Sequence, residues 1–220
     1  MKNLSLSDIT VEHWVQGGPV SLDDWVGSVI LIEVFQVNCP GCFIYALPRA
    51  IDLHQRYHDQ GLVVMGLATA FEDYDKNTLE NLQKLVTSGE VIGETYKALN
   101  QYGKLAEGKL PWKIPFPVGM DRVVEETEPV TDERVQRYAY EFLPEFEKYS
   151  DEQKLAVLQQ VKHYLQQKSR KAVTFERFAL QGTPSCIVFD RKAQLRDVSF
   201  GQIDYKQAMI EHLLVENAAD

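Results

Sequence analysis

The stretch Val29-Ile30-Leu31-Ile32-Glu33-Val34-Phe35, followed closely by Cys39-Pro40-Gly41-Cys42, decides how this chain folds. An almost continuous apolar run of this kind predicts a strand that is buried on both faces of a sheet. Proline suits the first position of a helix, because the N–H that it lacks would have no partner there. A helix that begins at Pro40 places Cys39 at its N-terminus, where free amides and the helix dipole favour the thiolate. Cys42 then lies about one turn later, within reach of a sulfur bonded to Cys39.

Composition narrows the classes of partner. The 220 residues carry a formal net charge of −9, which argues against a general nucleic-acid or anionic-membrane binder. No apolar run approaches the roughly 20 residues of a membrane span. The first ten residues lack the charged-then-apolar layout of a secretory signal. We therefore expect no nucleic-acid and no membrane partner, and a cytoplasmic location.

The cysteines favour redox chemistry over a structural role. Only Cys39, Cys42 and Cys186 occur, too few for a disulfide framework. A structural zinc site usually takes four ligands, and no second Cys-x-x-Cys or paired histidine motif completes one. We expect no metal and no tightly bound cofactor. A fold in which the motif has lost its chemistry remains an alternative.

The periodicity around the motif predicts a βαβ unit. Strands are expected at residues 29–35 and 62–67, with a helix between them from about Cys42, kinked at Pro48. A strand–helix–strand unit of this length makes its two strands parallel. Residues 185–189 and 195–200 predict an antiparallel pair that leads into a final helix. Residues 11–22, with Gly17-Gly18-Pro19 inside, predict a short N-terminal β-hairpin.

A long insert separates these two parts of the chain. Helical spacing is clear at residues 131–149, interrupted by Pro144, and at residues 151–168. No interdomain linker is evident, so we expect a single domain over residues 1–220 with a helical insertion at residues 122–180. The acidic run at residues 125–128 is interpreted as an exposed loop. An aromatic stripe on the first helix predicts a packing face, with a dimer contact or a lid over the dithiol as alternatives; it comprises Tyr138, Phe142, Phe146 and Tyr149.

This βαβ–ββα order with a Cys-x-x-Cys after the first buried strand resembles the thioredoxin fold. Thr183-Pro184 stands before a strand, where that family carries a cis-proline that faces the dithiol. Glu33 occupies the position of the family's buried acid, which helps to move protons, and Pro48 matches its helix-kinking proline. The resemblance implies an α/β fold, with a central mixed sheet flanked by helices.

A narrower likeness is to the redoxin branch, which includes peroxiredoxins and TlpA-type thiol–disulfide reductases. It is carried by the predicted hairpin and by residues 20–27 and 116–121. Two positions depart from the wider pattern: Asn38 replaces the usual Trp before the first cysteine, and Pro-Gly reverses the thioredoxin Gly-Pro. The Thr and Pro that peroxiredoxins need before their reactive cysteine are replaced by Gln36 and Ile32, so the peroxidase constellation is absent.

The resemblance implies a thiol–disulfide oxidoreductase, and the expected cytoplasmic location favours the reductase direction. In that reaction Cys39 attacks a substrate disulfide and Cys42 resolves the mixed disulfide. Glu33 is the candidate acceptor for the proton of Cys42, with a pKa that burial would raise. The candidate substrate-binding residues are Thr183, Pro184, Pro40 and Gly41.

The expected partners are protein or small-molecule disulfides and an external thiol reductant system. Two other functions stay open: a peroxiredoxin-like thiol peroxidase, in which Cys39 passes through a sulfenic acid, and a redox-inactive interaction module that uses the inserted helices. Glu33 is alternatively a structural acid. Cys186 is either a third redox thiol or a small buried apolar residue.

Overall fold

A six-stranded mixed sheet forms the centre of the chain, whose computed structural model describes residues 4–143, 145–201 and 206–216. In spatial order the strands are β1 (His13–Gln16), β4 (Val118–Met120), β3 (Leu62–Ala68), β2 (Val29–Phe35), β7 (Ser185–Phe189) and β8 (Leu195–Phe200). Strands β2 and β3 are parallel, β4 is parallel to β3, and β7 and β8 extend the sheet antiparallel on the other side of β2. The expected βαβ unit and the antiparallel C-terminal pair are therefore confirmed.

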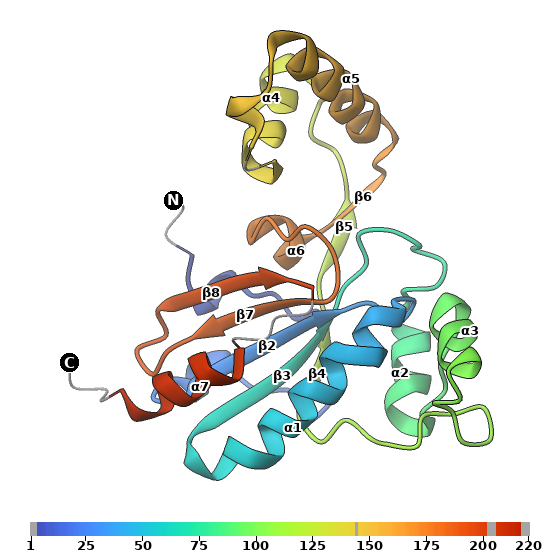
Figure 1. The fold of residues 1–220 in the computed structure, drawn as a ribbon, viewed down its shortest axis with the longest axis vertical. Helices are drawn as coiled ribbons and strands as arrows, with labels where there is room; N and C mark the ends of the chain where they lie inside the picture. The colour runs from blue at the N-terminus through green and yellow to red at the C-terminus, as the bar shows by residue number, and fades with distance from the viewer. Residues whose placement is uncertain (1–3, 144, 202–205, 217–220) are drawn as a thin grey trace.

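The central strand β2 is buried along its whole length because both faces of the sheet are covered. Its alternate residues belong to two separate cores, since successive side chains of a strand point to opposite faces. The face of Leu31 and Phe35 is covered by four helices (Figure 1), namely α1 (Leu47–Tyr57), α2 (Leu79–Ser88), α3 (Gly93–Gln101) and α7 (Lys206–Val215). The face of Ile32 is covered by the N-terminal segment and by α6 (Val173–Arg177).

The helix after the dithiol is irregular where Pro48 predicts a kink. The helical residues begin at Pro40, pass through a π-helical turn at Cys42–Ala46 and continue as α1. Proline has no N–H to donate to the carbonyl four residues earlier, so regular α-helical bonding is interrupted just before it. π-Helical turns of this kind are frequent at functional sites.

The predicted N-terminal hairpin is wrong. Residues 13–16 form a single strand, β1, which pairs antiparallel with the outer edge of β4. The turn that follows lies against the segment before β4, where a Cβ on Gly17 would stand 3.0 Å from the Cα of Pro117. The apolar residues after the turn enter a 3₁₀ turn, Leu22–Trp25, whose first and last side chains pack on the core. Tertiary burial therefore satisfies the apolar pattern that suggested a second strand.

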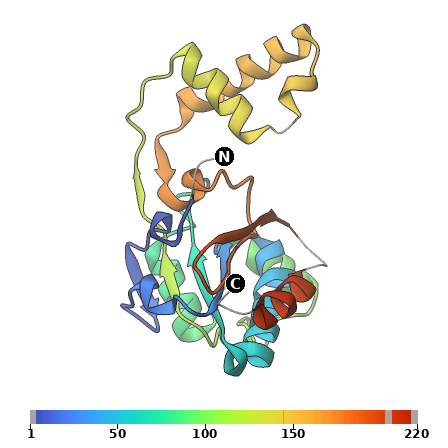
Figure 2. The same ribbon diagram turned by 90° about the vertical axis from the view of Figure 1, so that its left-hand side faces the viewer.

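The two inserted helices project from the body of the molecule (Figures 1 and 2). They are α4 (Asp132–Phe142) and α5 (Asp151–Gln167), joined through a 3₁₀ turn at Phe146–Lys148. This helical pair has its own small core and is carried on a two-stranded ribbon, the neck, formed by β5 (Val123–Glu125) and β6 (Arg170–Ala172). Pro144, where we expected the interruption, lies outside the described residues.

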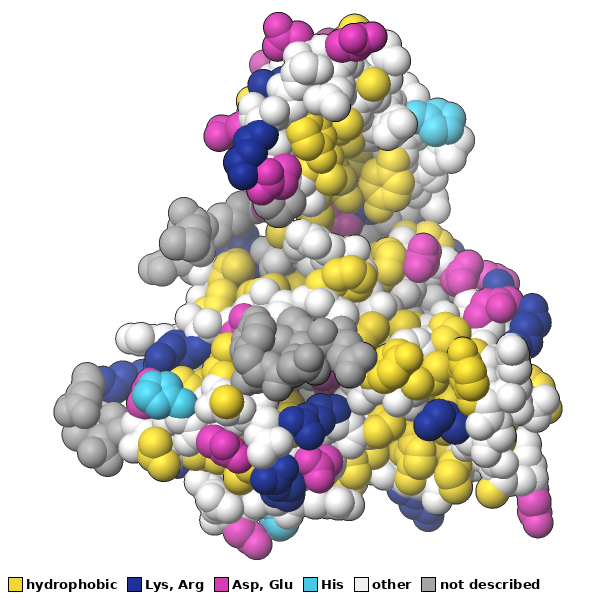
Figure 3. All heavy atoms as spheres, viewed as in Figure 1, with side chains coloured by type: hydrophobic (Ala, Val, Ile, Leu, Met, Phe, Trp, Pro, Cys, Tyr) yellow, Lys and Arg dark blue, Asp and Glu magenta, His cyan; other side chains and the backbone are white. Residues whose placement is uncertain are grey.

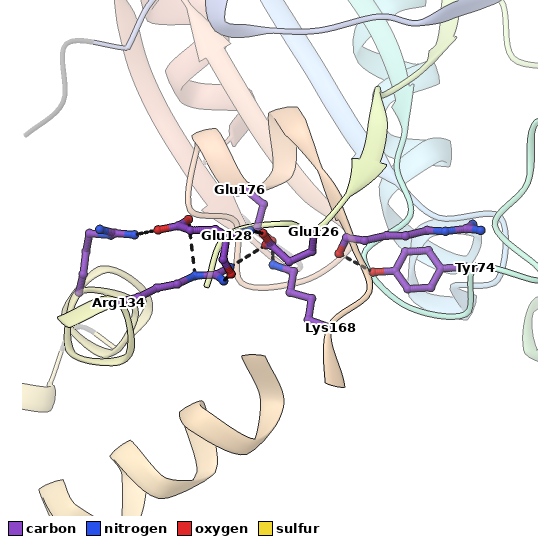
Figure 4. Close-up of polar contacts among 8 residues, drawn as sticks. Tyr74, Glu126, Glu128, Arg134, Lys168 and Glu176 are labelled. Atoms are coloured by element: carbon purple, nitrogen blue, oxygen red, sulfur yellow. Dashed lines mark hydrogen bonds and ion pairs between the residues drawn. The ribbon is translucent and has the colours of Figure 1, made fainter. Parts of the chain in front are cut away.

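The interpretation of residues 125–128 as an exposed loop is wrong for Glu126. Its carboxylate pairs with the Arg134 guanidinium at 2.7 Å, and the two side chains are only 4% and 7% exposed. The same guanidinium lies 3.5 Å from the Glu128 carboxylate (Figure 4). The acidic run therefore anchors the first turns of α4 to the neck, an interaction that requires a partner eight positions away.

On the other side of the neck, Lys168 forms an ion pair with Glu176 of α6, which belongs to the body (Figure 4). Tyr74 of the body donates a hydrogen bond to the carbonyl of Arg170 in β6 (3.0 Å). Polar contacts thus connect the helical pair to the sheet domain. Across the residues described, no helix has the length and apolar content needed to cross a bilayer.

Candidate functional site

The two motif cysteines lie at the end of β2, at the start of the helix that α1 continues. They are paired as a disulfide, with their Cα atoms 5.4 Å apart. The backbone N–H of Cys42 donates to the Cys39 sulfur at 3.3 Å. An amide that points at the leading sulfur stabilises a thiolate there, as expected at a helix N-terminus. Cys39 is 9% exposed and Cys42 is fully buried, so Cys39 is the sulfur that a substrate reaches first.

The segment Thr183–Pro184 packs directly against the dithiol, and its peptide bond is cis. The Cys39 sulfur lies 3.4 Å from the carbonyl oxygen of Thr183. Gly41 faces the proline ring, since a Cβ on this residue would stand 3.6 Å from Pro184 Cδ. Residues far apart in the sequence therefore meet at one site, and the side of the dithiol next to Thr183 presents backbone to an incoming molecule.

Gln36 holds this segment in place. The Thr183 hydroxyl donates to Gln36 Oε1 at 3.0 Å, and Gln36 Nε2 donates to the carbonyl of Glu72 at 3.3 Å. Ile32 is fully buried and belongs to the core on the opposite face of the sheet. The two positions that would carry the peroxidase constellation thus have packing and positioning contacts instead.

Asn38, noted in the sequence only for the Trp that it replaces, fixes the chain immediately before Cys39. Its side-chain amide donates to Asp73 at 2.6 Å, and its backbone N–H donates to Asn77 Oδ1 at 3.0 Å. Its Oδ1 accepts from the backbone N–H of Glu94 at 2.8 Å, in the first turn of α3. A Cβ on Gly93 would stand 2.2 Å from that oxygen, so only glycine fits there. These partners are distant in the sequence, and no local sequence pattern predicts them.

Glu33 lies on the sheet face that the helix after the dithiol covers. It is buried and stands opposite Cys186 in the register of β2 and β7. Burial raises the pKa of its carboxyl to about 8, against the opposing effect of the Lys206 ammonium. A carboxyl with this pKa exchanges protons near neutral pH, as a general base requires.

A cavity of about 510 Å³ lies behind the dithiol, between this sheet face and residues 44–52. Glu33, Cys186 and Lys206 line its inner wall, and Arg49 and Asp52 of α1 also line it. Burial raises the pKa of the Cys186 thiol to about 12, so the thiol stays protonated and is a poor nucleophile. Sequence reasoning missed Lys206, because an isolated lysine at a helix start carries no signal.

A metal centre has no support in the part of the chain that the structure describes. No group of three or more His, Cys, Asp or Glu side chains gathers there at a spacing that could hold an ion. The donors nearest the dithiol are backbone carbonyl and amide groups rather than a ligand set.

The chain is similar to known proteins in its structure. No protein-family model and no curated protein sequence matches the chain. Among solved structures, a thiol–disulfide isomerase from Corynebacterium glutamicum is 25% identical, with a TM-score of 0.60 and 98% and 99% of the two chains covered. The fold is thioredoxin-like.

Two further structures share the thioredoxin-like fold. A thioredoxin-like superfamily protein is 23% identical, with a TM-score of 0.59 and 99% of each chain covered. A thioredoxin-like protein in its oxidised form is 14% identical, with a TM-score of 0.51 and again 99% of each chain covered. The expected fold class is therefore confirmed, and the Cys39–Cys42 pair fits a Cys-x-x-Cys redox site.

Proposed function

We propose that this chain is a thiol–disulfide oxidoreductase that reduces substrate disulfides, with Cys39 as nucleophile and Cys42 as resolving thiol. The observation that carries the proposal is the paired dithiol at a helix N-terminus, with the Cys39 sulfur beside the Thr183 carbonyl. The similarity to a solved thiol–disulfide isomerase supports the same class of chemistry.

The reaction begins with the reduced dithiol. The Cys39 thiolate attacks one sulfur of a substrate disulfide, forms a mixed disulfide and releases the other sulfur as a thiolate. Cys42 then loses its proton and attacks Cys39, which breaks the mixed disulfide and releases the second substrate sulfur as a thiolate. The substrate gains two electrons and the protein becomes the Cys39–Cys42 disulfide. An external dithiol reductant returns it to the starting state.

Glu33 is the proposed acceptor of the Cys42 proton. Its side chain is buried on the sheet face of Leu31 and Phe35, which the helix after the dithiol covers, and burial brings the pKa of its carboxyl to about 8. A base with a pKa near the working pH is ionised often enough to take a proton and protonated often enough to return it. Glu33 can therefore carry the proton both when the substrate disulfide is reduced and in the reverse reaction.

The substrate contacts are proposed to come from Thr183, Pro184, Pro40 and Gly41. Gly41 has no side chain between its backbone and Pro184, and the Thr183 carbonyl lies beside the Cys39 sulfur, so backbone groups border the dithiol. An extended chain that carries a disulfide can lie along such a surface and pair with the backbone of Thr183. Protein disulfides and small disulfides both fit this chemistry.

The reductase direction is part of the proposal and rests on the expected cytoplasmic location, which stays a prediction. Related dithiol proteins span about −270 to −120 mV, about five powers of ten in the equilibrium constant. Measuring the potential of the Cys39–Cys42 couple against glutathione would place this protein in that range.

The decisive experiment is insulin-disulfide reduction in the presence of dithiothreitol. We expect the wild-type protein to accelerate precipitation of insulin chains, and Cys39→Ser to reduce turnover to the rate with dithiothreitol alone. Cys42→Ser should instead accumulate a mixed disulfide, because the resolving thiol is absent. Equal turnover by wild type and Cys39→Ser would exclude the proposed function and favour a redox-inactive module.

The peroxidase alternative is tested by stopped-flow oxidation with hydrogen peroxide. We expect Cys39 to react at the rate of an ordinary free thiolate. Gln36 stands where peroxiredoxins have their threonine, and its side chain is hydrogen-bonded to Thr183. A much faster reaction would reassign the site to peroxide reduction.

A further inference from the structure

A row of three side chains crosses the sheet behind the dithiol. Glu33 of β2 stands opposite Cys186 of β7, and Cys186 stands opposite Ser199 of β8. Residues directly opposite in antiparallel strands project to the same face, about 5 Å apart. The row therefore presents a carboxyl, a thiol and a hydroxyl toward the helices that cover this face.

Lys206, the first residue of α7, lies over this row. It is 7% exposed, and its Nζ donates to the Ser199 hydroxyl at 2.8 Å. Burial would lower the pKa of this ammonium, but its hydrogen bond with Cys186 and the carboxyl groups of Glu33 and Asp197 outweigh burial and raise it. Lys206 therefore keeps its positive charge among buried groups, where an ammonium is expensive without compensation.

Charged groups from two helices share the cavity with Glu33. α7 contributes Lys206, on which Asp197 of β8 acts in turn, while α1 contributes Arg49 and Asp52 to the cavity wall. Arg49 and Asp52 pair with each other at 3.5 Å, and both side chains are more than two-fifths exposed. Solvent screens such a pair strongly, so Lys206 is the cation that acts on Glu33 among these described residues.

We propose that Lys206 is a positioning residue for the dithiol reaction, and that its ammonium favours the ionised form of Glu33 when Cys42 must lose its proton. This inference rests on the proposed function and extends it from the dithiol to the C-terminal helix. In the resolving step the Cys42 proton moves to the Glu33 carboxylate, and the Cys42 thiolate attacks Cys39. The mixed disulfide breaks, and the substrate thiolate leaves. Lys206 neither gains nor loses a proton in this step.

The arrangement divides two tasks between two parts of the site. The amide of Cys42 stabilises the leading thiolate of Cys39, while Lys206 acts on the acid behind Cys42. Removing Lys206 should therefore change the resolving step and leave the first attack unchanged. A residue with a purely structural role would change both steps or neither.

The test follows both steps by stopped flow, with reduced protein and the aromatic disulfide of Ellman's reagent. Attack by Cys39 releases the first thionitrobenzoate, and attack by Cys42 releases the second. In wild type the rate of the second release should rise with pH to an inflection set by Glu33. In Lys206→Met that inflection should move to higher pH, and the rate at neutral pH should fall about tenfold for each unit of displacement.

Three further variants sharpen the test. Lys206→Arg keeps the charge and should restore the wild-type profile. Arg49→Met removes the other cation of the cavity wall and is the matched control, with no displacement expected. In a Glu33→Gln background, Lys206→Met should have no additional effect on the pH profile, because the lysine acts through the acid. Lys206→Gln, which keeps a donor for Ser199, replaces Lys206→Met if circular dichroism shows that the latter is unfolded.

The outcomes separate the two proposals. A wild-type protein without a second thionitrobenzoate release would defeat the dithiol function itself. A normal wild-type reaction combined with an unchanged profile in the neutral Lys206 variant, or with equal changes in both releases, would overturn the role of Lys206 and leave the oxidoreductase function standing.

Discussion

The dithiol end of the sheet domain and the projecting helical pair are built on opposite principles. At the dithiol, the deciding contacts join residues far apart in the chain, such as Cys39 with Thr183 and Asn38 with Glu94. In the helical pair, the contacts stay within one short segment: Ser150 and Gln153 form a reciprocal cap at the start of α5, and the small core joins α4 to α5. A site made of distant contacts exists only when the whole sheet is folded, whereas capped helices depend mainly on each other.

The neck is where the two regions meet, and several polar contacts lie there. Glu126, Glu128 and Arg134 form a cluster on one side, and Lys168 reaches Glu176 of the body on the other (Figure 4). Lys168 also lies 5.8 Å and 5.7 Å from the ring centres of Tyr138 and Tyr164. The aromatic face of the helical pair is thus partly used in holding the neck, which supports its interpretation as a packing face.

The largest expected effect comes from a matched truncation in the two cores. Leu31→Ala in β2 should lower the free energy of unfolding of the sheet domain by about 2–5 kcal/mol, because a fully buried side chain leaves a cavity. Leu165→Ala in α5 removes the same atoms at a similarly buried position, yet should destabilise only the helical pair. Native-state hydrogen exchange distinguishes these results. Loss of protection in β2 on Leu165→Ala would show that the two regions unfold as one unit.

A smaller effect, of opposite sign, is expected from Glu33→Gln in the oxidised protein. Between about pH 4.5 and 8 the unfolded chain has ionised this carboxyl while the folded protein keeps it protonated, so wild-type stability falls as the pH rises. Each unit of the pKa difference is worth about 1.4 kcal/mol, and the total is a few kcal/mol at most. Glu33→Gln lacks this loss and should become the more stable protein toward alkaline pH.

The measurement is urea unfolding of both proteins at about pH 5 and about pH 9. The difference in free energy of unfolding should grow in favour of Glu33→Gln between these two values. A constant difference would mean that the carboxyl titrates alike in the folded and unfolded states, and the proposed proton acceptor would lose its physical basis. For Leu165→Ala, the difference in free energy of unfolding from wild type should be the same at both pH values, since the helical pair lies away from Glu33.

The smallest effect is expected at the neck. Glu126→Gln breaks the buried pair with Arg134 but leaves Glu128 beside the guanidinium, so a loss of about 2 kcal/mol is expected rather than the full penalty of an unpaired charge. The loss should appear as faster exchange of α4 amides, while insulin reduction stays unchanged. Lys97→Ala, in an exposed ion pair of the body, serves as the control and should change stability by less than about 0.5 kcal/mol. A fall in reductase turnover in Glu126→Gln would show that the helical pair takes part in the reaction.

Much of the fold could be predicted from local patterns. The apolar run of β2, the periodicity of α5 and the antiparallel pair of β7 and β8 were all predicted, and all three form as expected. The prediction of an N-terminal hairpin was wrong because tertiary packing sets which strand pairs with which. β1 pairs with β4 and not with a segment next to it in the sequence. The short ribbon of the neck was not predicted for the same reason: the helical pair separates its two strands in the sequence.

Some residues of the candidate site could be predicted from the sequence and others could not. Cys39, Cys42, Thr183 and Pro184 could be named from the motif and its resemblance, and the structure brings them together. Lys206 and the contacts of Asn38 could not be named. A buried lysine is recognised only by what surrounds it, and an asparagine's partners are set by loops that the sequence does not place.

The sequence alone determined that this chain carries two cysteines one helical turn apart after a buried strand, because spacing and helix chemistry are properties of neighbouring residues. Only the tertiary structure decided what stands behind them. Strand register sets Glu33 against Cys186, and helix packing carries Lys206 over Ser199. The charge environment of a buried acid is a sum over groups from several elements, and that sum exists only once those elements are packed together.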